Sequence, residues 1–303
     1  MKRFCIISFM LLMGNLLSAQ PFAVVEFSVS NLRQKPDYES PLETQELMGT
    51  VVEYLDTEGY WMKIKSPQPY EAWATDKGYI KMNRESIEAY EKAPKYICVA
   101  NVSTVYSDAS RDSDPISDLV MGDVLRKVYM SGKIYRSKGF VKVILPSGKR
   151  GWVPEEDLMD KDMWKRQCAD NLVAGKTADN IVKLAKRFVG IPYLWGGMSP
   201  KGFDCSGLVR LCYLMNGIEL PRNASQQVKL GKNVELSDLK PGDLLFFGSI
   251  DDGGNEKVTH VGMYIGKNHF IHSSHVVRIN SLIKGDSDCY ENVSRLLRAR
   301  RML

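Results

Sequence analysis

The stretch P-Y-L-W-G-G-M-S-P-K-G-F-D-C-S-G, residues 192–207, decides how the chain is interpreted, because it places a cysteine where a loop becomes a helix. The glycines and prolines before Cys205 indicate an irregular loop, since glycine tolerates positive φ and proline interrupts hydrogen-bonded ladders. Residues 206–215 carry apolar side chains at helical spacing and end at Asn216-Gly217, a helix-stop signal. The unpaired N–H groups and the positive dipole end of this helix favour a thiolate over a thiol. We therefore expect Cys205 to sit where a nucleophilic cysteine needs to be.

A buried structural cysteine is the alternative interpretation of Cys205, because free cysteines are usually buried. Two histidines in later strand-like runs, His260 and His272, favour the nucleophile. A cysteine peptidase needs a thiolate, a base that protonates the leaving amine, and a third group that fixes the tautomer of the base. Strand alternation puts His260, Gly262 and Tyr264 on one face, where Gly262 leaves room for a neighbouring side chain or a substrate.

Three motifs in this order, F-D-C-S-G (203–207), L-K-P-G-D-L-L-F-F (239–247) and T-H-V-G-M-Y-I-G (259–266), resemble the NlpC-type family of bacterial cell-wall cysteine peptidases. The resemblance runs from about Thr177 to the C-terminus. It implies a papain-like fold and cleavage of γ-D-glutamyl–diamino-acid bonds in peptidoglycan peptides. It also implies that Cys205 is the nucleophile, that His260 is the base, and that His272 holds the other ring nitrogen of His260.

The resemblance further implies substrate-binding residues next to the nucleophile. Asp204 matches a residue that binds the free N-terminal amine of the substrate in the family branch with SH3-like domains; it also suits a helix cap, and one carboxylate can serve both roles. Tyr193 and Trp195 are either packing aromatics or neighbours of the thiol, where the Tyr193 hydroxyl would help to hold an oxyanion. Ser206 completes this set. The segment P-R-N-A-S-Q-Q, residues 221–227, fits a polar loop as well as a substrate contact.

The remaining histidines, His269 and His275, are interpreted as solvent-facing or structural. Together with His272 they would also suit a metal site. The sequence contains neither H-E-x-x-H nor paired C-x-x-C, which are the spacings typical of zinc sites. We therefore expect no metal, and no organic cofactor either, because the thiol supplies the nucleophile.

The N-terminus predicts export. A basic start at residues 2–3, an apolar run at 4–17 and small residues at 18–19 form a secretory signal that is too short and wrongly flanked to span a membrane. Gln20 stands where a bacterial lipoprotein needs cysteine, so we expect a soluble exported protein in the periplasm or outside the cell. The formal net charge of +5 is mild for 303 residues, and no basic stripe is interleaved with aromatics, which argues against nucleic acid as a partner.

An internal repeat lies between the signal and the catalytic part. W-M-K-I at 61–64 returns as F-V-K-V at 140–143, with an insertion in the second copy around residues 131–137. Short runs of β-branched and aromatic residues between polar turns predict one small all-β barrel per copy, and the pattern resembles bacterial SH3-like domains. We expect an α+β papain-like catalytic domain over residues 170–303, preceded by two such barrels over residues 20–84 and 94–160.

Three functions are compatible with this arrangement. The first is an exported endopeptidase that hydrolyses the bond from γ-D-Glu to an L-diamino acid, either meso-diaminopimelate or L-Lys. By resemblance to the branch typified by dipeptidyl-peptidase VI, the barrels would close one end of the cleft and admit only peptides with a free N-terminal L-Ala. Glu46 and Tyr70 of the first barrel would then assist Asp204. The alternatives are a wall-binding protein with an inert peptidase fold, and an amidase or acyltransferase on the same fold. In the first case the partners are peptidoglycan-derived peptides, and we expect a monomer.

Overall fold

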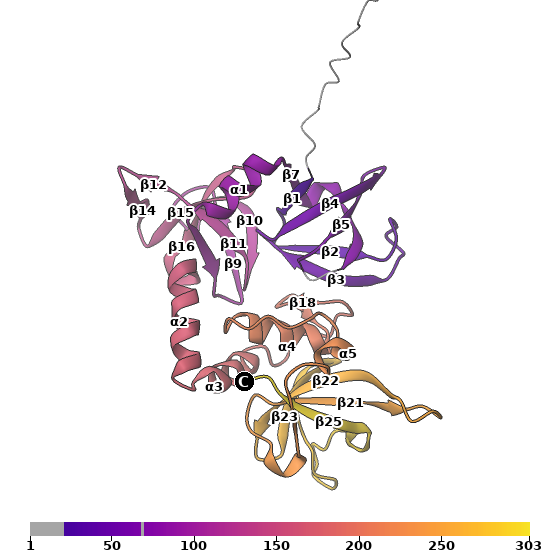
Figure 1. The fold of residues 1–303 in the computed structure, drawn as a ribbon. Coiled ribbons are helices and arrows are strands. Elements are labelled where there is room, and N and C mark those ends of the chain that lie inside the picture. Colours follow the sequence, from indigo (N-terminus) through magenta and orange to yellow (C-terminus); the bar gives the residue numbers. More distant parts are fainter. Residues whose placement is uncertain (1–20, 68–69) are drawn as a thin grey trace, which may run out of the picture.

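A computed structural model describes residues 21–67 and 70–303, so the predicted signal at residues 1–19 lies outside the described part. Two sheet-rich units are followed by a unit of helices and a third large sheet (Figure 1). The expected fold class, an α+β papain-like domain behind two small all-β barrels, is confirmed. Within the described residues no helix is long and apolar enough to cross a membrane.

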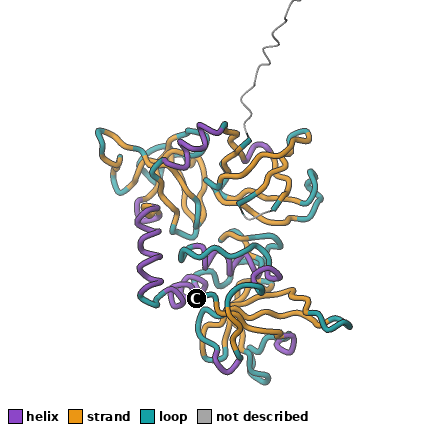
Figure 2. The backbone as a smooth tube through the Cα atoms, in the orientation of Figure 1, coloured by secondary structure: helices purple, strands orange, loops and turns teal. Residues whose placement is uncertain are grey.

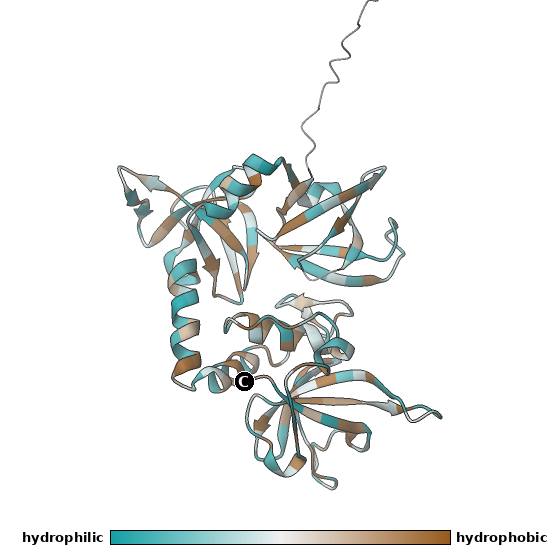
Figure 3. Ribbon diagram, in the orientation of Figure 1, coloured by the Kyte–Doolittle hydropathy of each residue, from teal (hydrophilic) through white to brown (hydrophobic). Residues whose placement is uncertain are grey.

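The first barrel is an antiparallel sheet with the strand order β3-β2-β6-β5-β4-β1-β7. Along β5, Met62 and Ile64 are buried whereas Lys63 and Lys65 are partly exposed, which is the period-two alternation of a half-buried strand. Figure 3 shows hydrophobic and hydrophilic bands along the strands of the two barrels. The elements are β1 (Phe22–Val25), β2 (Val29–Arg33), β3 (Leu42–Leu47), β4 (Val51–Glu58), β5 (Trp61–Lys65), β6 (Glu71–Thr75), η1 (Asp76–Gly78) and β7 (Tyr79–Met82).

The second barrel follows the helix α1 (Arg84–Lys92), which is capped by the Asn83 side chain. Its sheet has the order β10-β9-β16-β15-β11-β8-β17, with β14 paired to β15, and the insertion predicted around residues 131–137 forms part of the separate hairpin β12–β13 and strand β14. The elements are β8 (Lys95–Cys98), β9 (Val102–Tyr106), β10 (Pro115–Val120), β11 (Val124–Lys127), β12 (Tyr129–Met130), β13 (Lys133–Ile134), β14 (Arg136–Ser137), β15 (Phe140–Ile144), β16 (Arg150–Pro154), η2 (Glu155–Asp157) and β17 (Leu158–Asp160).

A long helix, α2 (Lys161–Val173), leads from the second barrel to the third unit (Figure 2). The Asp160 side chain caps it by accepting hydrogen bonds from the N–H groups of Asp162 and Met163, both at 2.9 Å. The next helix, α3 (Thr177–Lys186), packs on α4 (Cys205–Leu214).

In the third unit, α4 packs on an antiparallel sheet with the order β20-β25-β21-β22-β23-β24. Figure 1 shows α4 between this sheet and the two barrels. The remaining elements are β18 (Met198–Ser199), β19 (Gly202–Phe203), α5 (Ala224–Gln227), β20 (Lys232–Val234), η3 (Leu236–Asp238), β21 (Leu244–Ile250), β22 (Glu256–Gly266), β23 (His269–Ser274), β24 (Val276–Ser281), η4 (Val293–Arg295) and β25 (Leu296–Arg301).

Each barrel has a hydrophobic core of its own, and a further cluster joins both barrels to the third unit. Leu47 of the first barrel and Val120 of the second are buried in the same cluster as Leu211 of α4. The two barrels are also joined by the fully buried Asp123, whose carboxylate accepts from the N–H groups of Met48 at 3.0 Å and Val120 at 2.8 Å. Burial of this kind fixes the first barrel against α4 and therefore against the start of that helix, where Cys205 lies.

Candidate active site

Cys205 is the first residue of α4, at the position that the sequence predicts. The preceding residue, Asp204, accepts a hydrogen bond from the Gly207 N–H at 2.7 Å and so caps the helix. A Cβ on Gly207 would lie 2.1 Å from the Gly197 carbonyl oxygen, so the first turn packs directly on the glycine-rich loop. The close contact holds the nucleophile rigidly between loop and helix.

His260 and His272 lie on the neighbouring strands β22 and β23, against which α4 packs. Nε2 of His260 is 2.7 Å from Nδ1 of His272, and the backbone N–H of Val261, which follows His260, hydrogen-bonds to Cys205. Because Nε2 of His260 is engaged by His272, its Nδ1 is the nitrogen left to exchange a proton with the thiol. Cys205 and the two histidines thus lie on elements that pack against one another.

An aromatic enclosure surrounds the two imidazoles. The Tyr290 ring lies 4.8 Å from the His272 ring and 5.8 Å from the His260 ring, and the Phe270 ring lies 4.6 Å from His272. His272 is fully buried. Tyr290 was not singled out in the sequence, because it lies in an irregular segment without periodicity.

Burial decides the protonation of the site. It raises the pKa of the Cys205 thiol to about 12, an effect that the neighbouring Asp204 increases and that the N–H groups of Val261 and Ser206 only partly offset. Burial also lowers the pKa of His260 to about 3, with His272 and Arg278 acting in the same direction. The expectation that the helix start makes Cys205 a thiolate is therefore wrong, because desolvation outweighs the helix dipole and favours a neutral thiol beside a neutral imidazole.

Asp204 forms a buried ion pair that the sequence did not indicate. Arg222, whose side chain is 2% exposed, places Nη2 2.5 Å from Oδ2 and Nη1 3.1 Å from Oδ1 of the carboxylate. The carboxylate also accepts from the Gly196 N–H at 3.0 Å, the Ser206 hydroxyl at 3.1 Å and the Gly207 N–H. These five donors exceed the roughly four acceptor sites of a carboxylate, so an arriving ammonium would have to displace or share one of them.

The first barrel supplies one wall beside this ion pair. Thr44 of β3 accepts from Arg222 Nε at 2.8 Å, and the Gln45 side chain accepts from the Met198 N–H at 2.9 Å. The Tyr70 hydroxyl contacts the Asn223 side chain. Burial raises the pKa of Tyr70, and the charges of Arg222, Glu43 and Asp204 act on its hydroxyl. Tyr70 therefore reaches the catalytic unit at Asn223, the residue that follows Arg222.

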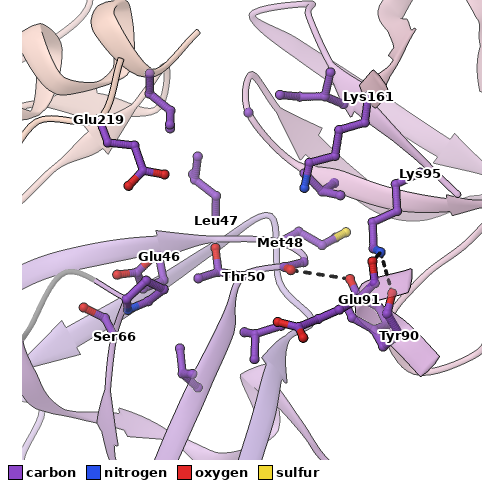
Figure 4. A pocket seen from close by; sticks show the side chains of 18 of the residues that line it. Glu46, Leu47, Met48, Thr50, Ser66, Tyr90, Glu91, Lys95, Lys161 and Glu219 are labelled. Carbon is purple, nitrogen blue, oxygen red and sulfur yellow. Dashed lines mark hydrogen bonds between the residues drawn. The ribbon is translucent and has the colours of Figure 1, made fainter. Parts of the chain in front are cut away.

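Glu46 has a different environment. It is buried, burial raises its pKa, and the charges that act on it are those of Arg210 and then Arg222. It lines a cavity of about 710 Å³ between the barrels and the third unit, together with Ser66 and Glu219 (Figure 4). Neither Cys205 nor His260 lines this cavity.

Tyr193 and Trp195, the two aromatic residues before the glycines, differ in exposure. Tyr193 is half-buried, and burial raises its pKa; negative charge on Cys205 or Asp204 would raise this pKa further, whereas the Arg222 charge lowers it. Trp195 is 67% exposed, so it packs in no core and presents an apolar ring at the surface.

The other two histidines have partners or surroundings of their own. His269 pairs with Asp288 at 3.2 Å, and His275 is exposed at the β23–β24 turn with a φ of 62°. Among residues 21–67 and 70–303, no cluster of three or more His, Cys, Asp or Glu side chains is arranged to hold a metal ion.

Known proteins resemble the chain in both parts. Residues 190–291 match the NlpC/P60 family, and residues 28–81 match the bacterial SH3 domain. A gamma-D-glutamyl-L-lysine dipeptidyl-peptidase of Bacillus cereus is 29% identical, over 86% of this chain and 75% of its own length. The Bacillus subtilis protein of the same name is 29% identical over 77% of this chain and 72% of its own, and dipeptidyl-peptidase 6 of Lysinibacillus sphaericus is 26% identical over 86% and 91%. A solved structure of an NlpC/P60 family protein from Bacillus cereus, 24% identical, has the same fold with a TM-score of 0.74, covering 93% of this chain and 99% of that one.

Proposed function

We propose that this chain is a cysteine peptidase that hydrolyses the amide bond between γ-D-glutamate and an L-diamino acid in peptidoglycan stem peptides. The matches to the NlpC/P60 family and, ahead of it, to the bacterial SH3 domain support this proposal. The names of the relatives give the γ-D-glutamyl-L-lysine bond as theirs. The observation that carries the proposal is the alignment of Cys205 at the start of α4 with the His260–His272 pair, because a thiol, a base and an orienting group are what amide hydrolysis through a thioester requires.

The first half-reaction forms a thioester. The Cys205 proton passes to Nδ1 of His260 while sulfur attacks the γ-carbonyl carbon, and the carbonyl oxygen takes up the negative charge. The Cys205 N–H, which lies in the first helical turn without an intrahelical partner, and the Tyr193 hydroxyl stabilise this oxyanion. His260 then gives the proton to the leaving α-amine as the C–N bond breaks.

Water completes the cycle. It gives a proton to His260 as its oxygen attacks the thioester carbon, the C–S bond breaks, and the proton returns to sulfur. Ion-pair formation between sulfur and His260 is confined to the reaction itself, because burial disfavours both charged forms beforehand.

The first barrel makes the enzyme selective for a free N-terminal L-Ala. The contacts of Thr44 with Arg222 and of Tyr70 with Asn223 support a wall at one end of the cleft. Since Arg222 neutralises Asp204, an ammonium needs a further anion, and a buried ammonium without one is costly. Asp204, Ser206 and Tyr70 then form the amine site, with Glu46 as the added charge, because Glu46 is buried two residues along β3 from Thr44, on the strand face that contacts Arg222, and the Arg222 charge acts on it.

A cleft that is closed at one end admits released peptide fragments and excludes intact wall. The enzyme therefore serves peptide recycling outside the cytoplasm, after removal of residues 1–19. To test the function, the protein without this segment is incubated with L-Ala-γ-D-Glu-meso-diaminopimelate, beside Cys205→Ala. Release of L-Ala-D-Glu by the parent alone supports the proposal. An uncut peptide would favour the wall-binding alternative, and transfer of the acyl group to an added amine would favour the acyltransferase.

A further inference from the structure

A fourth polar residue, Asn280, continues the chain of hydrogen bonds from His260 through His272. Asn280 lies on β24, one strand further along the sheet from His272 on β23. Its Oδ1 is 2.9 Å from Nε2 of His272, and its Nδ2 donates to the backbone carbonyl of Asp288 at 2.7 Å. Because a carbonyl oxygen only accepts hydrogen bonds, the amide nitrogen must face Asp288, and Oδ1 must therefore face His272.

The orientation of the Asn280 amide determines which ring nitrogen of each histidine carries the proton. Oδ1 of Asn280 is an acceptor, so Nε2 of His272 carries the proton, and the neutral ring presents a lone pair at Nδ1. Burial lowers the pKa of His272 to about 4, so the ring is neutral at neutral pH. Nε2 of His260 then donates to that lone pair across 2.7 Å, which leaves Nδ1 of His260 free to accept the thiol proton.

We propose that Asn280 is a positioning residue, which holds the His272–His260 pair in the one tautomer that can deprotonate Cys205, with the Asp288 carbonyl as its anchor. It contacts neither the thiol nor the substrate. Without the Oδ1 acceptor, His272 is free to move its proton to Nδ1, where it would oppose the Nε2–H of His260 and turn the base away from its working state. The inference rests on the peptidase function proposed above.

A purely structural role for Asn280 can be separated from this one. The segment after β24 is also held by Ser281, whose hydroxyl donates to Asp286 at 2.6 Å and accepts from the Ile283 N–H at 3.0 Å. The Ser281 N–H donates to the Asp288 carbonyl oxygen at 3.0 Å, the same acceptor that the Asn280 side chain uses, and an alanine at position 281 keeps this backbone bond. Ser281→Ala is therefore a matched control, because it loosens the same segment from the adjacent position without a hydrogen bond to either histidine.

The first experiment measures steady-state kinetics on the tripeptide. Asn280→Leu keeps the volume and removes the acceptor, and we expect kcat to fall at least about tenfold with KM changed by less than about threefold, since the interaction acts on the reaction and not on binding. In a His272→Ala background the same change should alter kcat by less than about twofold. An equal loss in both backgrounds, or an equal loss from Ser281→Ala, would overturn the proposal.

The second experiment needs no substrate, so it stands even if the proposed peptide is not cleaved. The rate at which iodoacetamide alkylates Cys205 is followed against pH, with the modified peptide identified by mass spectrometry. Asn280→Leu should slow alkylation several-fold near pH 7. Asn280→Asp keeps an acceptor and adds a negative charge, so it should move the acidic limb to higher pH by stabilising the imidazolium.

The other groups around the pair stay constant in this comparison. The Arg278 charge and the Tyr290 ring act on the histidines, and Cys205 begins α4, which packs on the two strands that carry them. Arg278 opposes protonation in the parent and in every variant alike. Identical alkylation profiles for the parent, Asn280→Leu and Asn280→Asp would reject Asn280 as the residue that sets the tautomer.

Discussion

The Arg222 guanidinium lies 2.5 Å from the Asp204 carboxylate, next to the residue that begins the nucleophile helix. The pair is buried, and Arg222 also donates a hydrogen bond to Thr44 of the first barrel. The cap of α4 and the wall of the cleft therefore depend on one ion pair. A single change at Arg222 should disturb both.

Arg222→Met should lower the free energy of unfolding by about 3–5 kcal/mol, because it leaves the Asp204 carboxylate buried without its partner. Urea denaturation of the Cys205→Ala protein measures the effect. The control is Arg298→Met, which breaks the exposed pair of Arg298 with Glu256 at 2.6 Å and should cost no more than about 1 kcal/mol. Similar losses from the two changes would show that the buried pair is not the stronger constraint.

Cys205→Ala should abolish cleavage while the protein stays folded. Cys212, fully buried on the same helix, is the matched control, and Cys212→Ala should retain activity. His260→Ala should be nearly as severe as the loss of Cys205, and the double variant no worse than either single one, because the two residues act as a unit. If activity survives in Cys205→Ala but not in Cys212→Ala, Cys212 is the nucleophile.

The start of α4 could be predicted from sequence because it depends on local signals: the glycines of the loop, the cap at Asp204 and the helical spacing after Cys205. The burial of Arg222 could not, since its partner Thr44 is 178 residues away in the chain and belongs to another sheet. The protonation of the Cys205 thiol could not be predicted from sequence for the same reason. A helix dipole is local, whereas desolvation depends on what the barrels and strands pack around the thiol. Asn280 lies in no motif, and only the pairing of β23 with β24 brings it to His272.

Acidification should destabilise the protein through its buried histidines. The pKa of His272 is about 4 in the folded state and close to 6.5 in the unfolded chain, so between these values the unfolded state binds more protons. Stability is therefore lost as the pH falls from about 6.5 to about 4, by up to roughly 3 kcal/mol from this residue, and no further below.

Urea denaturation across this pH range, in the Cys205→Ala background, checks the effect. His272→Gln should flatten the dependence, because glutamine does not titrate. The control is His275→Asn, since His275 is exposed and asparagine tolerates its φ of 62°. A slope that is unchanged by His272→Gln would assign the acid sensitivity to other groups.

Glu46→Gln should weaken the preference for a free N-terminal amine by about tenfold, because it removes one charge from the amine site while preserving shape. Glu43→Gln is the matched control and should change the preference by less than about twofold, since the Glu43 carboxylate, on the same strand, accepts an exposed hydrogen bond from the Gln34 side chain. The ratio of kcat/KM for the free and the N-acetylated tripeptide measures this preference. A larger effect from Glu43→Gln than from Glu46→Gln would assign the amine partner to Glu43.

The central claim is that the catalytic triad and the first barrel together form a site for a γ-D-glutamyl peptide with a free amine. The most direct measurement is a competition in one tube between L-Ala-γ-D-Glu-meso-diaminopimelate and its N-acetylated form, with products identified by mass spectrometry. Acetylation removes the charge and adds bulk at a single point, so we expect the free peptide to yield L-Ala-D-Glu at least about a hundredfold faster, a difference of about 2.7 kcal/mol or more. Equal consumption of the two peptides, or cleavage at any bond other than the γ-D-glutamyl one, would contradict the account.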